Sequence, residues 1–151
     1  MRKSGAISLV FTFVFLVCWS CGSSKNTVAT TPEESGIFDA QKADTVAISD
    51  AASNYDIVII EPGFQTWLQS IARPEGYYSQ SFLENRNQIY VTSWNQRVLL
   101  PMQYDPLLYE IQINYDPNVD YGYEVNYKLY NYFIYFQRKY KQRLGPFLPR
   151  I

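Results

Sequence analysis

The feature that most constrains the fold is an abrupt change in composition at Tyr55. All fourteen tyrosines lie from this residue onwards, together with Trp67, Trp94 and five phenylalanines. An aromatic side chain buries about 150–250 Å², so these residues can dominate the core of a small domain. We therefore expect residues 55–151 to form one aromatic-rich globular domain.

The composition also excludes several kinds of chemistry. The chain of 151 residues contains no histidine, only two cysteines (Cys18 and Cys21), and a formal net charge of −1. Histidine-dependent catalysis, Cys–His nucleophiles and Cys/His zinc sites are thereby excluded. A charge near zero also lacks the basic footprint of a nucleic-acid-binding protein. We expect no cofactor and no nucleic-acid partner.

The N-terminus has the pattern of a bacterial lipoprotein signal. Two basic residues precede an apolar run over residues 5–17, which is too short for the ~30 Å hydrocarbon layer but suits a signal peptide. The run ends at Ser20-Cys21, and a small residue before a cysteine resembles the lipobox at which cysteine is acylated. We predict a signal peptide at residues 1–20, lipid on Cys21 and, because Gly22 follows, sorting to the outer membrane facing the periplasm.

Two alternatives to lipidation stay open. One is an ordinary cleaved signal that leaves a free cysteine. The other is an uncleaved anchor in the inner membrane, formed by extending the apolar run through Trp19. Either way, residues 21–54 are polar and lack tyrosine, so we predict that they form a disordered tether.

Periodicity in the body predicts an α+β domain, a small two-to-three-stranded sheet packed with three or four helices. A continuous apolar run indicates a strand that is buried on both faces. An alternation of apolar and polar residues indicates a second strand with one solvent-exposed face. Helical spacing indicates the remaining elements, with a break near Asn87 in the middle helix and a left-handed cap at Gly145. The expected order is strand 56–61, helix 64–72, helix 77–100, strand 108–115 and helix 124–143.

Three segments resemble a known family. They are Ile-Val-Ile-Ile-Glu-Pro-Gly-Phe-Gln-Thr-Trp-Leu at 57–68, Ser-Trp-Asn-Gln-Arg at 93–97 and Glu-Val-Asn-Tyr-Lys-Leu-Tyr-Asn-Tyr-Phe at 124–133. Over about residues 55–143 the chain resembles an uncharacterised lipoprotein family of Bacteroidota, a domain of unknown function. The resemblance implies a location in the envelope and no activity.

Two motifs are candidate ligand sites. Asp116, Asn118 and Asp120 have the 1, 3, 5 spacing of oxygen ligands in a calcium loop, but Tyr121 stands where such a loop needs glycine. These residue types also simply form turns.

Tyrosines beside turns are candidates to stack on a sugar ring, or alternatively to join the core. The candidate contacts are Tyr77, Tyr78, Tyr121 and Tyr123.

Charge is segregated along the body. Residues 55–127 hold nine acidic and three basic side chains, whereas residues 128–151 hold six basic and no acidic ones. The bases complement the dipole of the last helix and can dock on the acidic part, or they can contact an anionic partner. The candidate contacts are Arg138, Lys139, Lys141 and Arg143.

We expect a non-catalytic binding or structural module of the cell envelope, anchored through Cys21, whose partner is an envelope protein or glycan. One alternative is a carboxylate-dependent hydrolase. Glu61, at the end of a predicted strand, is then the candidate acid, although an inert pair with Arg73 or Arg97 also explains it. The second alternative is a subunit held by an uncleaved N-terminal membrane helix.

Overall fold

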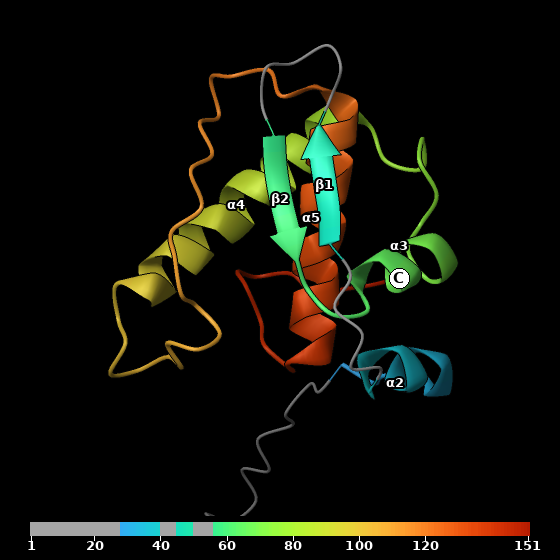
Figure 1. Cartoon of the computed structure of the whole chain (residues 1–151). Helices are drawn as coiled ribbons and strands as arrows, with labels where there is room; N and C mark the ends of the chain where they lie inside the picture. Colours follow the sequence, from blue (N-terminus) through green and yellow to red (C-terminus); the bar gives the residue numbers. More distant parts are fainter. Residues whose placement is uncertain (1–27, 40–44, 50–55) are drawn as a thin grey trace, which may run out of the picture.

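The computed structural model describes residues 28–39, 45–49 and 56–151, and this part of the chain is mostly helical (Figure 1). The long helix α5 lies in the centre, α4 crosses it on one side, and a two-stranded hairpin lies across its other face. The helices are α2 (Pro32–Asp39), α3 (Phe64–Ser70), α4 (Gln80–Val98) and α5 (Gly122–Lys139), and the strands are β1 (Thr45–Ser49) and β2 (Asp56–Ile60).

The core is built around α5 because this helix is buried on almost every side. Twelve of its residues are buried. Tyr135 contacts the edges of Phe64 and Trp67 at ring-centroid distances of 5.4 and 5.6 Å, and Phe136 lies 4.8 Å from Trp94. Edge-to-face pairs of this kind contribute about 0.5–1.5 kcal/mol beyond the burial of their area. The tyrosine-rich body thus derives its stability from aromatic packing around one helix.

Helix α4 is continuous where the sequence predicts a break. Ser79 caps its start by accepting a hydrogen bond from the Phe82 amide at 3.2 Å. Asn87 is fully buried, and its side-chain nitrogen donates to the Asn126 backbone and side-chain oxygens, each at 3.0 Å. This residue therefore fastens α4 to α5, and the polar position that suggests a break is an interhelical contact.

The expected α+β class, with a two-to-three-stranded sheet as one layer of the body, is wrong. Only the short β1–β2 hairpin is paired in the described part of the chain, with Thr45 opposite Ile60 and Ser49 opposite Asp56. Residues 108–115 run without helix or strand assignment. Tyr109 is buried and Ile113 half-buried, but Ile111 is exposed, and side chains of α4 take the place of a neighbouring strand.

The predicted disordered tether over residues 21–54 also needs correction where it is described. Thr31 and Glu34 form a reciprocal capping box, with the Glu34 amide donating to Thr31 Oγ1 at 3.2 Å and the Thr31 amide to Glu34 Oε2 at 3.0 Å. Helix α2 follows and contacts α3. Residues 28–39 therefore belong to the folded body.

Helix α5 ends four residues earlier than expected. Lys141, and not Gly145, provides the left-handed residue directly after the helix, with φ 51°. The Gln142 amide donates to the Gln137 carbonyl at 3.0 Å, which closes the helix end. The residues from Lys141 onwards lie outside the helix. No helix among the described residues is both long enough and apolar enough to cross a membrane.

Candidate functional site

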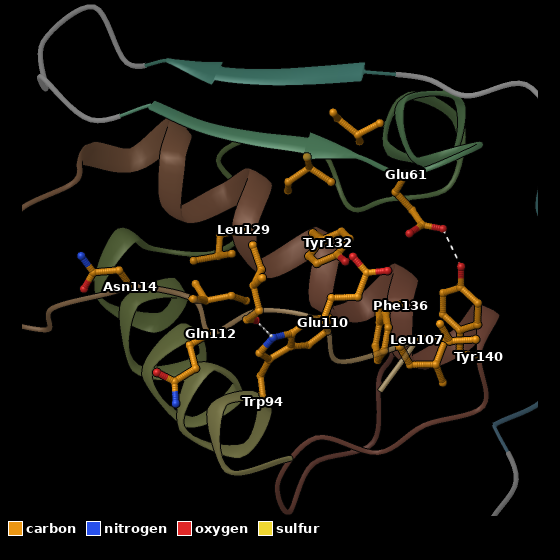
Figure 2. A pocket seen from close by; sticks show the side chains of 15 residues that line it. Glu61, Trp94, Leu107, Glu110, Gln112, Asn114, Leu129, Tyr132, Phe136 and Tyr140 are labelled. Carbon is orange, nitrogen blue, oxygen red and sulfur yellow. Dashed lines mark hydrogen bonds between the residues drawn. The ribbon is translucent and has the colours of Figure 1, made fainter. Parts of the chain in front are cut away.

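A groove of about 520 Å³ opens between β2, the segment 107–114 and α5 (Figure 2). Its floor is apolar and comes from two helices: Trp94 of α4, and Leu129 and Phe136 of α5. Ile60 and Ile111 stand at its rims and are 67% and 74% exposed. The groove is therefore a trough with an apolar floor and uncovered aliphatic side chains at its rims, of a size typical of ligand sites.

One rim of the groove is an extended segment fastened from behind by α4. The Trp94 indole donates to the Ile111 carbonyl at 2.9 Å. The Asn95 side chain donates to the Ile113 carbonyl at 2.9 Å and accepts from the Ile113 amide at 2.8 Å. Asn95 thus makes the two bonds that a neighbouring strand would make to Ile113.

This arrangement leaves the alternate backbone groups of the segment unpaired. In an extended chain, the amide and carbonyl of one residue point to one side, and those of the next residue point to the other. The Ile111 carbonyl and both backbone polar groups of Ile113 point to α4, so an extended backbone here turns the polar groups of Glu110, Gln112 and Asn114 away from it. They make no backbone hydrogen bond to any described residue.

The opposite rim is β2, which also has an unpaired edge. Within the described chain β2 pairs only with β1, so its second edge carries amides and carbonyls without a strand partner. Ile59 and Ile60 of β2 line the groove together with residues 107–114. Two strand-like edges therefore border one trough.

A polar cluster closes one end of the groove (Figure 2). Glu61 Oε1 accepts from Lys139 Nζ at 2.7 Å and from the Tyr140 hydroxyl at 2.8 Å. Burial, followed by the hydrogen bond to Glu61, raises the pKa of Tyr140. Burial, followed by the charge of Glu61, also raises the pKa of Tyr132. Both phenols therefore stay protonated at neutral pH, and Tyr140 donates its proton to the hydrogen bond with Glu61.

Glu110 is the second carboxylate of the groove and is exposed at its rim. Glu61 and Glu110 are the charged side chains that line the groove in the described structure. Of the two, Glu61 is already paired with Lys139, so Glu110 is the carboxylate that can meet a cation. Glu61 forms an ion pair as predicted, but the predicted partner, Arg73 or Arg97, is wrong: the partner is Lys139 of α5.

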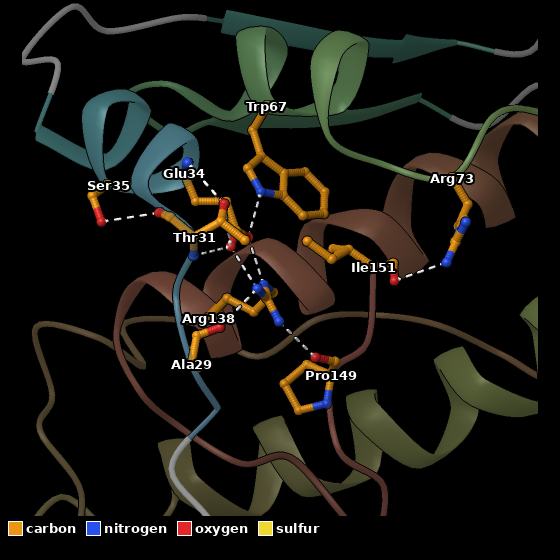
Figure 3. Close-up of polar contacts among 9 residues, drawn as sticks. All are labelled: Ala29, Thr31, Glu34, Ser35, Trp67, Arg73, Arg138, Pro149 and Ile151. Carbon is orange, nitrogen blue, oxygen red and sulfur yellow. Dashed lines mark hydrogen bonds and ion pairs between the residues drawn. The ribbon is translucent and has the colours of Figure 1, made fainter.

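A second cluster, buried and structural, joins α2 to α5 (Figure 3). Arg138 donates to both carboxylate oxygens of Glu34, and the Trp67 indole donates to Glu34 Oε1 at 3.1 Å. Arg138 also donates to the carbonyls of Ala29 and Pro149, each at 3.1 Å. Burial alone would raise the pKa of Glu34, but these hydrogen bonds outweigh it and lower the pKa.

This cluster corrects the prediction that four bases contact an anionic partner. Arg138 is 5% exposed and committed to Glu34, and Lys139 is largely buried and paired with Glu61. Neither can reach a ligand without breaking its ion pair. Lys141 and Arg143 remain exposed.

The predicted tyrosine contacts are divided between surface and core. Tyr77 is 56% exposed beneath the Arg73 guanidinium, and Tyr78 is half-buried and stacked on Phe82. Tyr123 is half-buried, and its hydroxyl accepts from the Gly76 amide at 2.6 Å.

Tyr121 is buried in a stack with Tyr115, and its hydroxyl accepts from the Asp116 amide at 2.9 Å. The four tyrosines therefore do not form one platform.

The predicted calcium ligands make turn contacts. Asp116 Oδ1 accepts from the Asn118 backbone and side chain at 2.8 and 2.9 Å. Asp120 Oδ1 accepts a hydrogen bond from the amide of Gly122, the first residue of α5, at 2.9 Å. It also accepts one from the Gln80 side chain at 2.8 Å. The described residues contain no group of three or more acidic, histidine or cysteine side chains that could hold a metal ion. Cys21 and residues 1–20, the predicted signal peptide, lie outside the described residues.

Comparison with known proteins places the chain in one family. No curated protein and no solved structure matches it. The model of a family of unknown function, DUF6146, matches residues 8–147, which is nearly the whole chain. The chain therefore belongs to this family of unknown function.

Proposed function

We propose that the protein is a lipid-anchored binding module of a bacterial envelope, whose groove takes up an extended segment of a partner protein as an added strand. The observation that carries this proposal is the pair of strand-like edges without a strand partner, β2 and residues 110–114, that border one trough with an apolar floor. A peptide between them gains backbone hydrogen bonds on both sides. Strand addition is a common mode of peptide recognition.

The side chains of the groove indicate the chemistry of the segment. Alternate residues of an inserted strand would face the apolar floor at Trp94 and Phe136, and the residues between them would face solvent. Glu110 at the rim favours a basic side chain in the partner, and among the described residues no lysine or arginine lines the groove to oppose it. The proposed ligand therefore alternates apolar and basic residues.

Binding is tested with the full chain in detergent micelles and a short synthetic peptide of alternating valine and lysine. We expect saturable binding, and loss of binding when the valine amides are N-methylated, because the backbone donors are then removed. Glu110→Gln should weaken binding by up to about fivefold, the range for an exposed ion pair. Glu75→Gln, at an exposed position outside the groove, should leave it unchanged.

Two results would contradict this part of the proposal. Equal binding of the N-methylated peptide would exclude strand addition. Cleavage of the peptide that is lost in Glu110→Gln would instead assign the groove to the carboxylate-dependent hydrolase that the sequence also allows.

The anchor rests on the signal pattern around Cys21 and on the resemblance to a lipoprotein family of Bacteroidota. In this proposal, residues 1–20 are removed and acyl chains on Cys21 hold the body at the periplasmic face of the outer membrane. Each buried methylene of such a chain contributes about 0.8 kcal/mol, so several chains hold the protein firmly.

Intact mass and membrane fractionation test the anchor in a bacterial host that processes lipoproteins. We expect loss of residues 1–20 with a lipid increment, and release from the membrane in Cys21→Ser. The matched control is Cys18→Ser, which should stay lipidated because Cys18 lies within the removed segment. Retention of residues 1–20 without lipid would show an uncleaved membrane helix instead.

A further inference from the structure

The exposed apolar residues of the body gather mainly in one loop. Of the eight large apolar side chains that are exposed in the described structure, four lie within residues 99–107. Met102 is 100% exposed, and the other three are Leu99, Leu100 and Leu107 at 67%, 47% and 79%. Single exposed apolar residues are ordinary, but a contiguous group marks an interaction surface.

The loop is held in place and does not hang free. The amides of Gln103 and Tyr104 donate to the Leu100 carbonyl at 2.9 and 3.0 Å. Arg97 covers the Tyr104 ring at 4.8 Å. The apolar side chains are therefore displayed by an ordered turn, and their exposure is a property of the fold.

Two exposed bases lie beside this loop. Arg97 donates to the Gln142 side chain at 3.3 Å and to the Arg143 carbonyl, so it joins the loop to the residues that follow α5. Lys141 and Arg143 are exposed there. The one carboxylate of the loop, Asp105, accepts a hydrogen bond from the Leu107 amide at 2.9 Å. We call Leu99, Leu100, Met102, Leu107, Lys141 and Arg143 the loop-end surface.

Lys141 occupies a position that favours a different residue. Its φ of 51° lies in the left-handed region, where glycine is the unstrained choice. A lysine at this position keeps a cation at the loop-end surface despite the backbone strain.

The proposed anchor lies close to the same end of the body. Arg138, in the last turn of α5, donates a hydrogen bond to the Ala29 carbonyl, and Ala29 is eight positions after Cys21 in the sequence. Eight extended residues span at most about 29 Å. Figure 1 shows the loop after α4, the C-terminal end of α5 and the first described residues at one end of the molecule.

We infer that the loop-end surface docks on the anionic lipid bilayer to which Cys21 is anchored. The apolar side chains enter the interfacial region, and Lys141 and Arg143 contact anionic headgroups. This is the usual division of labour at membrane surfaces. The groove, which Leu107 also lines at one end, is then held close to the membrane surface. The inference rests on the proposed function in one respect: the anchor at Cys21 brings the bilayer close to the loop-end surface.

The test uses the full lipidated chain in vesicles of phosphatidylcholine and phosphatidylglycerol. An environment-sensitive fluorophore is attached to Met102→Cys in a Cys18→Ser background, and quenching by spin-labelled lipid is measured. The control site is Asn118→Cys, which is exposed in the turn before α5, at the other end of that helix. We expect quenching at position 102 and none at position 118.

Charge substitutions give the size of the effect. Replacing Lys141 and Arg143 together by glutamine should lower the ratio of docked to undocked protein roughly thirty-fold, about fivefold for each base. Vesicles of phosphatidylcholine alone should lower quenching at position 102 in the same way.

Other outcomes overturn the inference and are distinguishable from failure of the anchor. Protein that does not float with the vesicles lacks the anchor. Protein that floats but is not quenched at position 102 is anchored without docking. A concentration-dependent change at position 102 in lipid-free detergent would show that a second copy of the chain covers this surface.

Discussion

The buried ion pair between Glu34 and Arg138 makes the folded body dependent on a segment that sequence composition predicts to be a tether. Glu34→Ala removes the carboxylate and leaves the Arg138 guanidinium, which is 5% exposed, without a charge partner. It also leaves the buried Trp67 indole without its acceptor. The substitution therefore tests whether α2 is part of the fold.

The expected cost follows from these two lost interactions. Removing one partner of a buried ion pair costs about 3–5 kcal/mol, because the remaining charge is uncompensated. A buried neutral donor without an acceptor costs about 1–3 kcal/mol. The two costs overlap, since water that enters to solvate Arg138 also reaches Trp67. We expect a loss of about 3–5 kcal/mol in the free energy of unfolding.

Urea unfolding followed by tryptophan fluorescence measures this loss. With a slope of about 1–3 kcal/mol per molar urea, the midpoint should fall by more than about 1 M. Glu33→Ala is the matched control, because Glu33 is the exposed neighbour in the same turn of α2, and it should change stability by less than about 0.5 kcal/mol. Equal midpoints for the two variants would refute the conclusion that α2 is docked through this pair.

Three further predictions concern pH, a glycine and the groove. Because the fold lowers the pKa of Glu34 below its ordinary value of 4.5, ionised Glu34 stabilises the fold fully above pH 4.5. This stabilisation is lost as the pH falls through the pKa of Glu34 in the folded state. Acid unfolding of Glu34→Gln should therefore lack this component of the pH dependence. Gly63→Ala should destabilise the fold by about 1–3 kcal/mol in thermal melts, because the added Cβ meets a backbone oxygen of α2 at 2.8 Å. The control is Gly76→Ala, which has a similar φ but open space around the added Cβ and should cost less. Asn95→Leu should cost about 1–3 kcal/mol and speed amide exchange at Ile113, and unchanged exchange would show that Asn95 does not hold the groove rim.

Local sequence signals predict most of the helices but misplace their ends. The helices expected at 64–72, 77–100 and 124–143 are confirmed as α3, α4 and α5, of which α3 and α4 are shorter than expected, whereas α5 begins two residues earlier and ends four residues earlier. Their apolar spacing is set by burial against one core, so periodicity reveals them. Helix α2 was missed, although Thr31-Pro-Glu-Glu34 is a capping box with proline in its first turn.

The error in fold class has a specific physical cause. Residues 108–115 alternate like a strand, and periodicity reports that one face is buried but not what satisfies the backbone. Here the polar groups of Ile113 are satisfied by a side chain of α4, so no sheet is needed. A strand partner can only be recognised once the three-dimensional arrangement is known.

The site was predicted only in part for a similar reason. Glu61 was singled out because it follows a strand, and it does line the groove. Glu110 was missed, because it belongs to the groove only after α4 fixes the segment that carries it. Arg138 was assigned to the surface, because its partner Glu34 lies 104 residues away and no local pattern links the two.

The central claim, strand addition in the groove, predicts a residue-by-residue pattern of hydrogen exchange. When the valine–lysine peptide binds, the amides of Glu110, Gln112 and Asn114 should exchange more slowly, because they gain acceptors. The Ile113 amide, which already donates to Asn95, should not change. Uniform slowing across residues 110–114, or no slowing at the three unpaired amides, would contradict the account.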